Sequence, residues 1–230
     1  MNIIKNRALK SFNTFGIDVN AKEFVSVDSV EDLVDVLDTN PAPIMVLGGG
    51  SNMLLTKDIE ALVLHINLKG ISILSKSKNS VKVQVAAGEN WHELVRWCLN
   101  ENFGGLENLS LIPGNVGTAP IQNIGAYGVE LKDSFISCEA INIQTKALKT
   151  FTKEGCNFGY RNSIFKQELK GQFIIMSVVF ELSSHQHTLK TNYGAIEAEL
   201  KNSGIEKPTI QDVSKAVISI RNSKLPDPKI

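Results

Sequence analysis

The glycines of this 230-residue chain are concentrated in two short stretches, and this concentration constrains its fold more than any other feature. Glycine has about its average share overall, at 17 residues, yet Gly48, Gly49 and Gly50 are consecutive and six more lie between 104 and 128. Glycine lets a backbone take a positive φ or come very close to another group. We therefore expect two segments with unusual backbone geometry, and we expect function there.

Charge and composition exclude several classes of protein. The chain has 24 Lys and Arg against 24 Asp and Glu, and 43% of its residues are hydrophobic, as in globular proteins. Zero net charge disfavours non-specific binding to nucleic acid or to an anionic membrane, because both need clustered Lys and Arg. The length suggests one or two domains. We find no apolar run of about 18 residues and no signal peptide, so we predict no membrane span.

The cysteines and histidines do not suggest a disulfide framework or a metal site. Cys98, Cys138 and Cys156 are odd in number and widely spaced, without the C-x-x-C spacing of zinc sites. This pattern favours a reducing cytoplasm. His185 and His187 could face one side of a strand, but a solvated loop is the simpler interpretation. We therefore predict no bound metal.

The first 70 residues alternate strand and helix signals. Strands are predicted at 23–27, 44–47 and 61–66, and Ser29 with Asp32 begins a helix that Asn40-Pro41 ends. The result is a small β-α-β-β unit in which the triple glycine follows a short buried strand, 44–47.

A second region begins near residue 71. Valines alternate with polar residues over 81–85, as in a half-buried strand, and Asn90 with Glu93 begins an amphipathic helix over 91–100. Further strands are predicted at 135–143 and 173–182, and further helices at 192–201 and 209–221.

The triple glycine suits an anion. Successive N–H groups in such a turn can form an anion-binding nest, and Ser51 and Asn52 add donors, so a pyrophosphate is the obvious ligand. Position 53 is methionine and no helix signal follows, so the dinucleotide fingerprint G-x-G-x-x-G is absent, as is a P-loop. Taken alone, the triple glycine fits a ligand loop and an ordinary tight turn equally well.

The second glycine segment, 109–128, favours a ligand. It carries almost no charge, and its glycine turns flank Thr118, Gln122 and Asn123. Loops of this length without a function are uncommon. A neutral, amide-rich path predicts a large planar or dinucleotide ligand whose charge is met by backbone N–H groups.

Several motifs together resemble one enzyme family. They are the two glycine segments, Asn13-Thr14-Phe15, the hexapeptide 160–165 (Tyr-Arg-Asn-Ser-Ile-Phe) and the ending 223–229. In this order and over the length of the chain, they resemble MurB, the UDP-N-acetylenolpyruvoylglucosamine reductases. The resemblance implies an α+β, FAD-binding fold of the vanillyl-alcohol-oxidase type, with FAD between two α/β subdomains. These would be residues 1–70 and 71–205, with 206–230 as a helix and linker toward an absent substrate-binding third domain.

The same resemblance implies which residues hold FAD. The first glycine turn would hold the pyrophosphate, and 113–128 would wrap the rest of the cofactor. The implied residues are Gly48, Gly49, Gly50, Ser51, Asn52, Met53, Leu54, Pro113, Gly114, Gly117, Thr118, Ala119, Asn123, Ile124, Gly125, Tyr127, Gly128 and Arg221.

Arg161 is the expected catalytic residue. In the nearly uncharged stretch 157–165, it fits either a helix-surface arginine or a guanidinium presented to developing negative charge. The resemblance favours the second interpretation, in which Arg161 polarises the substrate carboxylate as the enol forms. It also implies substrate contacts by Tyr160, by Tyr193 in the family's tyrosine loop, and by Lys224. A packed aromatic and a solvated lysine are the alternatives for the last two.

The implied activity is cytoplasmic and serves peptidoglycan precursor synthesis. It is the FAD-dependent, NADPH-using reduction of UDP-N-acetylglucosamine enolpyruvate to UDP-N-acetylmuramate. The family's general-acid serine lies in a Gly-Asn-Ala-Gly-Ser-Phe-Phe motif, and a glutamate near the C-terminus also stabilises charge; this chain stops at Ile230, before both. We therefore expect a truncated form that binds FAD with little turnover. The alternatives are a stand-alone FAD-binding module without reductase activity, or another flavin oxidoreductase, which would not explain the tyrosine-loop match.

Overall fold

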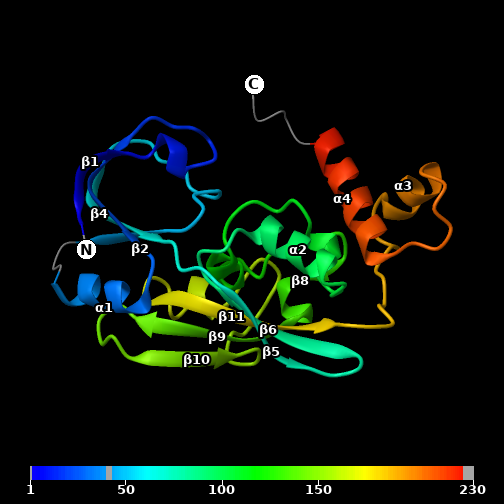
Figure 1. Ribbon diagram of the computed structural model, residues 1–230. Helices are drawn as coiled ribbons and strands as arrows, with labels where there is room; N and C mark the ends of the chain where they lie inside the picture. The colour runs from blue at the N-terminus through cyan, green and yellow to red at the C-terminus, as the bar shows by residue number, and fades with distance from the viewer. Residues whose placement is uncertain (1, 40–42, 225–230) are drawn as a thin grey trace.

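The computed structural model describes residues 2–39 and 43–224, which form two large β-sheets and four α-helices (Figure 1). A third, two-stranded sheet joins β7 (Gly125–Ala126) to β8 (Val129–Glu130). The expected helix stop at Asn40-Pro41 and residues 225–229 of the matched ending lie outside the described residues.

The first sheet confirms the expected β-α-β-β unit and adds one strand to it. The order of its strands is β1 (Ile4–Ala8), β2 (Asn20–Val27), β4 (Ile59–Ile66) and β3 (Ile44–Leu47). β2, β4 and β3 are parallel to one another, and β1 is antiparallel to β2. β1 was not predicted because all five of its residues are exposed, so it shows no apolar alternation. The prediction that 44–47 is buried was wrong: β3 lies at the sheet edge, and Val46 is 37% exposed.

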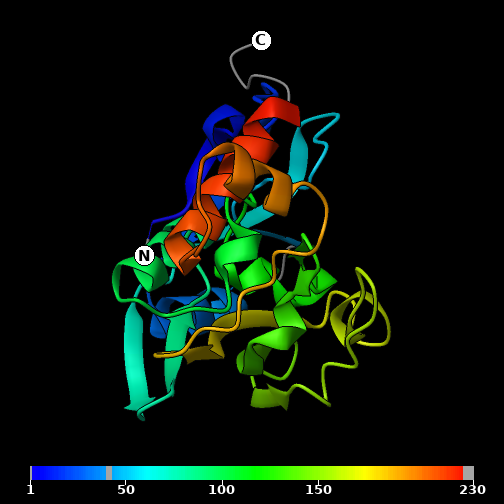
Figure 2. The same cartoon turned by 90° about the vertical axis from the view of Figure 1, so that its right-hand side faces the viewer.

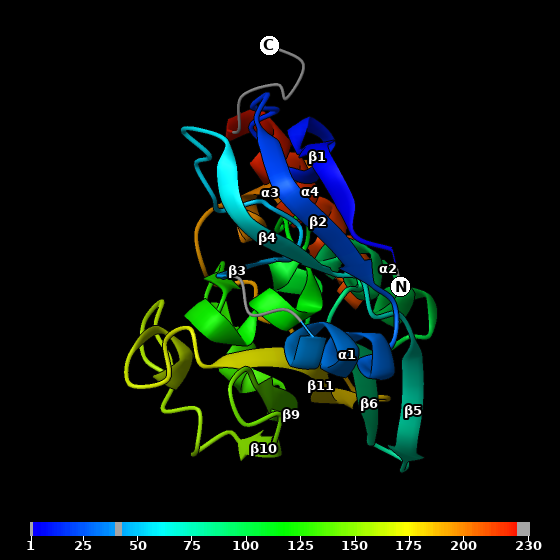
Figure 3. The same ribbon diagram turned by 90° about the vertical axis from the view of Figure 1, so that its left-hand side faces the viewer.

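The helix α1 (Val30–Thr39) begins where the sequence predicted. The Ser29 hydroxyl accepts a hydrogen bond from the N–H of Asp32, at 3.0 Å, which caps the first turn. Leu33, Val36 and Leu37 are buried in a core that includes residues of both sheets. Figure 3 shows that α1 lies between the two large sheets. Its buried side chains therefore help to hold the two sheets together.

The second sheet is antiparallel throughout. Its order is β10 (Leu148–Thr152), β9 (Phe135–Asn142), β11 (Phe173–Ser183), β6 (Ser80–Ala86) and β5 (Ile71–Lys76). The three inner strands were predicted. The edge strands β5 and β10 were not, because nearly all of their residues are exposed.

The helix α2 (Trp91–Asn100) covers one face of this sheet and has the predicted bounds. The Asn90 side chain accepts a hydrogen bond from the N–H of Glu93, at 3.1 Å. Trp91, Leu94 and Cys98 are buried in the largest core of the molecule, against the inner strands of the sheet.

Two helices near the end of the chain, α3 (Ile196–Asn202) and α4 (Ile210–Lys224), pack on each other at one side of the molecule (Figures 1 and 2). The prediction that the first helix starts at residue 192 was wrong by four residues, because 192–195 form a turn in which Gly194 has a φ of +65°. The hydroxyls of Ser214 on α4 and Ser110 lie 2.7 Å apart, which ties α4 to the second glycine segment.

The three cysteines are buried and free. A hydrogen bond with Cys156 and burial hold the pKa of the Cys138 thiol far above its ordinary range. Among the described residues, no group of three or more His, Cys, Asp and Glu could hold a metal ion, and no helix is long and apolar enough to cross a membrane.

Candidate functional site

The two glycine segments meet. A Cβ atom on Gly49 would lie 3.0 Å from the Cα of Gly114 and 2.9 Å from Oδ1 of Asn115, and a Cβ on Gly48 would lie 2.8 Å from a methyl carbon of Thr118. Real Cβ atoms need more room than this, so these residues are glycine partly because two backbones pack against each other. Sequence reasoning weighed a ligand loop against a tight turn and missed this contact.

The N-terminal segment supports the first glycine turn. Gly50 has a φ of +59°, and a Cβ there would lie 2.0 Å from the carbonyl oxygen of Phe12. Thr14 N–H donates to the Gly50 carbonyl at 3.2 Å. The buried side chain of Asn13 donates to the carbonyls of Leu9 and Ile17 and so shapes the same segment.

The first glycine turn keeps donors available. The backbone N–H groups of Gly49, Gly50, Ser51 and Asn52 donate no hydrogen bond to another backbone group within residues 2–39 and 43–224. Unpaired N–H groups gathered in a glycine turn are suited to an anion.

The second glycine segment is anchored along residues 87–91. Val116 N–H donates to the carbonyl of Glu89, and Gly117 N–H to that of Ala87, both at 2.9 Å. Trp91 N–H donates to the Gly114 carbonyl, also at 2.9 Å. The segment continues through two short 3-10 turns, η3 (Val116–Thr118) and η4 (Pro120–Gln122). It is therefore an ordered segment with fixed hydrogen bonds and not an irregular loop.

Three cavities adjoin one another along these segments. The largest, about 580 Å³, lies between the two sheets and is lined mainly by apolar side chains: Val46, Met53, Ile66, Ile143, Phe165, Leu169, Phe173, Ile174 and Ile175. The middle cavity, about 300 Å³, is lined by all of 48–53 and shares Gly48, Met53, Thr118, Ile121 and Lys166 with the largest.

The third cavity, about 250 Å³, shares Ser51, Asn52, Pro113, Gln122 and Ile124 with the middle one. Ile112, Gly125, Arg161 and Arg221 complete its lining, and no acidic residue of the described chain belongs to it. The three cavities therefore form one continuous row. It leads from a mainly apolar cavity, whose lining also includes Lys166 and Lys170, to a small cavity with two arginines.

Arg161 lies in a turn, so a helix-surface arginine was the wrong alternative. Its φ is +52°, a left-handed conformation that costs a non-glycine residue about 1 kcal/mol. Nη2 of Arg161 donates to the carbonyl of Gly125, and its own carbonyl accepts a hydrogen bond from Nζ of Lys166 at 3.1 Å. These contacts hold the guanidinium at the cavity wall.

Arg221 approaches the same cavity from α4. Its Nε is buried and has no hydrogen-bond partner among the described residues. A buried, unpaired donor is costly, so it is expected to serve a ligand. Two guanidinium groups in one small cavity suit an anionic ligand.

Most of the predicted cofactor residues line the row of cavities. Those that do are Gly48, Gly49, Gly50, Ser51, Asn52, Met53, Pro113, Gly117, Thr118, Ala119, Ile124, Gly125 and Arg221. Eight of the predicted site residues do not line it: Leu54, Gly114, Asn123, Tyr127, Gly128, Tyr160, Tyr193 and Lys224.

The positions of these eight differ. Leu54, Tyr160 and Tyr193 are 70%, 84% and 57% exposed, and Lys224 is exposed. Buried Asn123 donates to the Gly159 carbonyl at 3.0 Å, and its Oδ1 accepts from the N–H of Lys132. The roles of these residues in binding stay predictions.

Several cavity residues were not among the predicted site residues, and two polar ones are Lys166 and Gln122. Lys166 lines the largest and the middle cavity, and it directly follows the matched hexapeptide 160–165. Gln122 lines the middle and the third cavity, and its Oε1 lies 3.4 Å from Nδ2 of Asn52. The position of Gln122 within the uncharged segment was the available signal.

Comparisons with known proteins identify relatives of this chain. A family model described as an FAD binding domain matches residues 22–150. A UDP-N-acetylenolpyruvoylglucosamine reductase of Flavobacterium johnsoniae is 59% identical over 230 residues, which are 100% of this chain and 68% of the relative. The chain belongs to this reductase family. Another reductase of the family, from Pseudomonas fluorescens, is 49% identical over 226 residues, 97% of this chain and 66% of the relative. The chain thus spans about two thirds of the length of these reductases.

Solved structures confirm the expected fold. The MurB reductase of Thermus caldophilus has a TM-score of 0.68 at 23% identity, covering 99% of this chain and 71% of that one. A solvent-stable cholesterol oxidase has a TM-score of 0.55 at 17% identity, covering 79% and 38%. The chain therefore has the FAD-binding fold of the vanillyl-alcohol-oxidase type, and FAD is its cofactor, as the match to the FAD binding domain model indicates.

Proposed function

We propose that the row of three cavities holds FAD, and that the protein uses FAD and NADPH to reduce the enolpyruvyl group of UDP-N-acetylglucosamine enolpyruvate. The relatives' name, UDP-N-acetylenolpyruvoylglucosamine reductase, supports this substrate. The observation that carries the proposal is the order of environments along the row, from a mainly apolar cavity through a glycine turn to two arginines.

Each part of the row suits one part of FAD. The apolar cavity between the sheets suits the adenine ring. The glycine turn offers the N–H groups of Gly49, Gly50, Ser51 and Asn52 to the pyrophosphate, and Lys166 adds a positive charge beside them. Hydrogen bonds from such donors to a charged phosphate are among the stronger ones in proteins. The third cavity is left for the flavin ring and the substrate.

FAD, when bound, supplies the hydride transfer. Arg161, held by the Gly125 carbonyl, presents a permanent positive charge to the substrate carboxylate, where negative charge grows as the double bond is reduced. Arg221 adds a second charge at the same cavity. Because the Gly125 carbonyl holds Arg161 in place beforehand, little reorganisation of this guanidinium is needed during the reaction.

The test begins with the purified 230-residue chain and FAD. We expect saturable binding of one FAD per chain, seen as flavin absorbance bands and a change in flavin fluorescence. A chain that takes up no FAD would refute the proposed cofactor site.

The enolpyruvyl nucleotide sugar is then added to the FAD-loaded chain. A change in the flavin spectrum supports the substrate assignment. FAD binding without any response to this nucleotide sugar or to NADPH would instead favour the stand-alone FAD-binding module. NADPH oxidation with and without the nucleotide sugar tests the expectation of little turnover by residues 1–230.

We further infer a cytoplasmic location and a nucleotide-sugar partner. Three free, buried thiols suit a reducing compartment. Two cations at one end of the row suit an acidic nucleotide ligand.

A further inference from the structure

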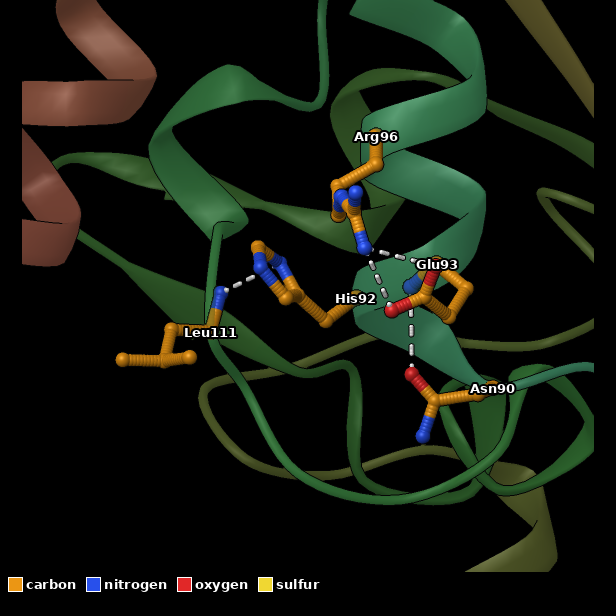
Figure 4. Close-up of polar contacts among 5 residues, drawn as sticks. All are labelled: Asn90, His92, Glu93, Arg96 and Leu111. Atoms are coloured by element: carbon orange, nitrogen blue, oxygen red, sulfur yellow. Dashed lines mark hydrogen bonds and ion pairs between the residues drawn. The ribbon is translucent and has the colours of Figure 1, made fainter.

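His92, the second residue of α2, supports the wall of the third cavity from outside. Its Nδ1 accepts a hydrogen bond from the backbone N–H of Leu111 at 3.0 Å (Figure 4). Leu111 has a φ of +60°, a left-handed conformation that costs a leucine about 1 kcal/mol. The hydrogen bond that Leu111 donates to His92 therefore lies at the strained point of this segment.

The strained point adjoins the third cavity. Ile112 and Pro113, the two residues after Leu111, line that cavity. Trp91, the first residue of α2, holds residues 109–114 at both ends. The indole Nε1 of Trp91 donates to the carbonyl of Leu109, and the backbone N–H of Trp91 donates to the carbonyl of Gly114, both at 2.9 Å. The hydrogen bond from Leu111 to His92 falls between these two attachments, at the bend.

The bond requires a neutral imidazole. Nδ1 can accept only when it carries no proton, so the other ring nitrogen, Nε2, carries one. Protonation of Nδ1 would turn this acceptor into a donor that faces another donor, the Leu111 N–H, and the two would repel.

The charged groups around His92 are Glu93 and Arg96 of α2 and Arg221 of α4. Arg96 is engaged with Glu93, whose carboxylate oxygens lie 3.1 Å from Nη1 (Figure 4). Burial lowers the pKa of His92 below its ordinary 6.5, and Arg96 and Arg221 act in the same direction, whereas Glu93 opposes them.

We propose that His92 is a positioning residue for the cofactor: in its neutral form it holds Leu111 in the left-handed conformation and so sets Ile112 and Pro113 at the flavin end of the site. Protonation of His92 releases this wall and weakens FAD binding. The inference rests on the proposed function, because it takes FAD to occupy the row of cavities.

The test compares two variants across pH 5.5 to 8. His92→Asn keeps an acceptor oxygen at the position of Nδ1 and does not titrate, whereas His92→Leu has no acceptor. His185→Leu, which alters an exposed histidine outside the cavities, is the matched control.

The FAD affinity of the wild-type chain should be constant above about pH 6.5 and fall as the pH drops below it. We expect His92→Leu to bind FAD about tenfold more weakly than wild type at pH 8, the upper range for one hydrogen bond. His92→Asn should bind as wild type does at pH 8 and lack its loss of affinity at low pH. Wild-type affinity in His92→Leu at pH 8, or an unchanged pH profile in His92→Asn, would overturn the proposal.

A second measurement needs no FAD. Amide exchange at Leu111 in the FAD-free chain should be slow in wild type and His92→Asn at pH 7.5, and fast in His92→Leu. Equal exchange in all three would overturn the proposed anchoring of Leu111. Slow exchange in a chain that binds no FAD would instead identify the cofactor assignment as the failure.

Discussion

The Cα of Gly114 lies 3.0 Å from the point that a side chain on Gly49 would occupy, so two segments far apart in sequence pack backbone against backbone. One segment follows a strand of the first sheet, and the other is anchored to residues 87–91, next to the second sheet. The row of cavities runs along this contact. Its shape therefore depends on the absence of side chains at both positions.

Gly50→Ala should destabilise the fold strongly. The added Cβ would meet the Phe12 carbonyl at 2.0 Å, a backbone atom that cannot easily move, and the φ of +59° adds strain. We expect a loss of about 3 kcal/mol in the free energy of unfolding, measured by urea denaturation. Gly16→Ala is the matched control, because Gly16 has a φ of +63° but nothing within 4 Å of its added Cβ, and it should lose about 1 kcal/mol. Equal losses would contradict the importance of the Phe12 contact.

Lys166→Met should weaken FAD binding about tenfold while leaving the fold intact, because it removes a positive charge and keeps an unbranched side chain. Binding should also depend less on salt, since a charge interaction with the pyrophosphate is lost. Isothermal titration with FAD at two salt concentrations measures both effects. Lys78→Met, in an exposed turn, should change neither. An unchanged salt dependence in the Lys166 variant would argue against this role.

Arg161→Gln should separate cofactor binding from substrate binding. FAD affinity should stay within about twofold of wild type, because the glycine turn is untouched, whereas the flavin spectral response to the enolpyruvyl nucleotide sugar should be lost. The control Arg96→Gln at pH 8 removes a surface ion pair with Glu93, which contributes little to stability. A full spectral response in Arg161→Gln would contradict the proposed contact with the substrate.

Asp212→Asn should destabilise α4 in a pH-dependent way. Thr209 donates to the Asp212 carboxylate from its hydroxyl at 2.7 Å and from its N–H at 3.0 Å, which holds the pKa of Asp212 below its ordinary 3.8. A lowered folded pKa means that this stabilisation is complete above pH 3.8 and is lost as the pH falls through the folded value. The variant should therefore lose about 1 kcal/mol at pH 7, the typical value for a helix cap, and less at pH 3. Urea denaturation at both pH values measures the difference, and an equal loss at both would contradict the assignment.

The elements that sequence predicted well carry strong local signals. α2 has a capping residue and a buried face, and β6 alternates valine with polar residues, so both were placed correctly. β1, β5 and β10 were missed because edge strands expose nearly all of their side chains, and such strands carry no apolar pattern. The burial of β3 was misjudged because strand order is set by pairing between distant residues.

For the candidate site, the sequence predicted the two segments that form it but not the contacts that hold them in place. Glycine spacing and the family resemblance located both segments, and the structure brings them together at the row of cavities. The contacts that hold the segments in place could not be predicted, because Trp91 and His92 act on a stretch about 20 residues further along the chain. Lys166 was missed because a single lysine at the end of a motif looks like a surface residue.

Leu111 and Arg161 both hold left-handed backbone at the third cavity, where glycine would cost less. A redesign that optimised thermostability alone would therefore choose glycine at both positions. The first replacement would loosen the wall beside Ile112, and the second would delete the guanidinium. Heat resistance gained by this route would come with loss of the proposed active site, so libraries that aim to stabilise this fold should leave these two positions unchanged.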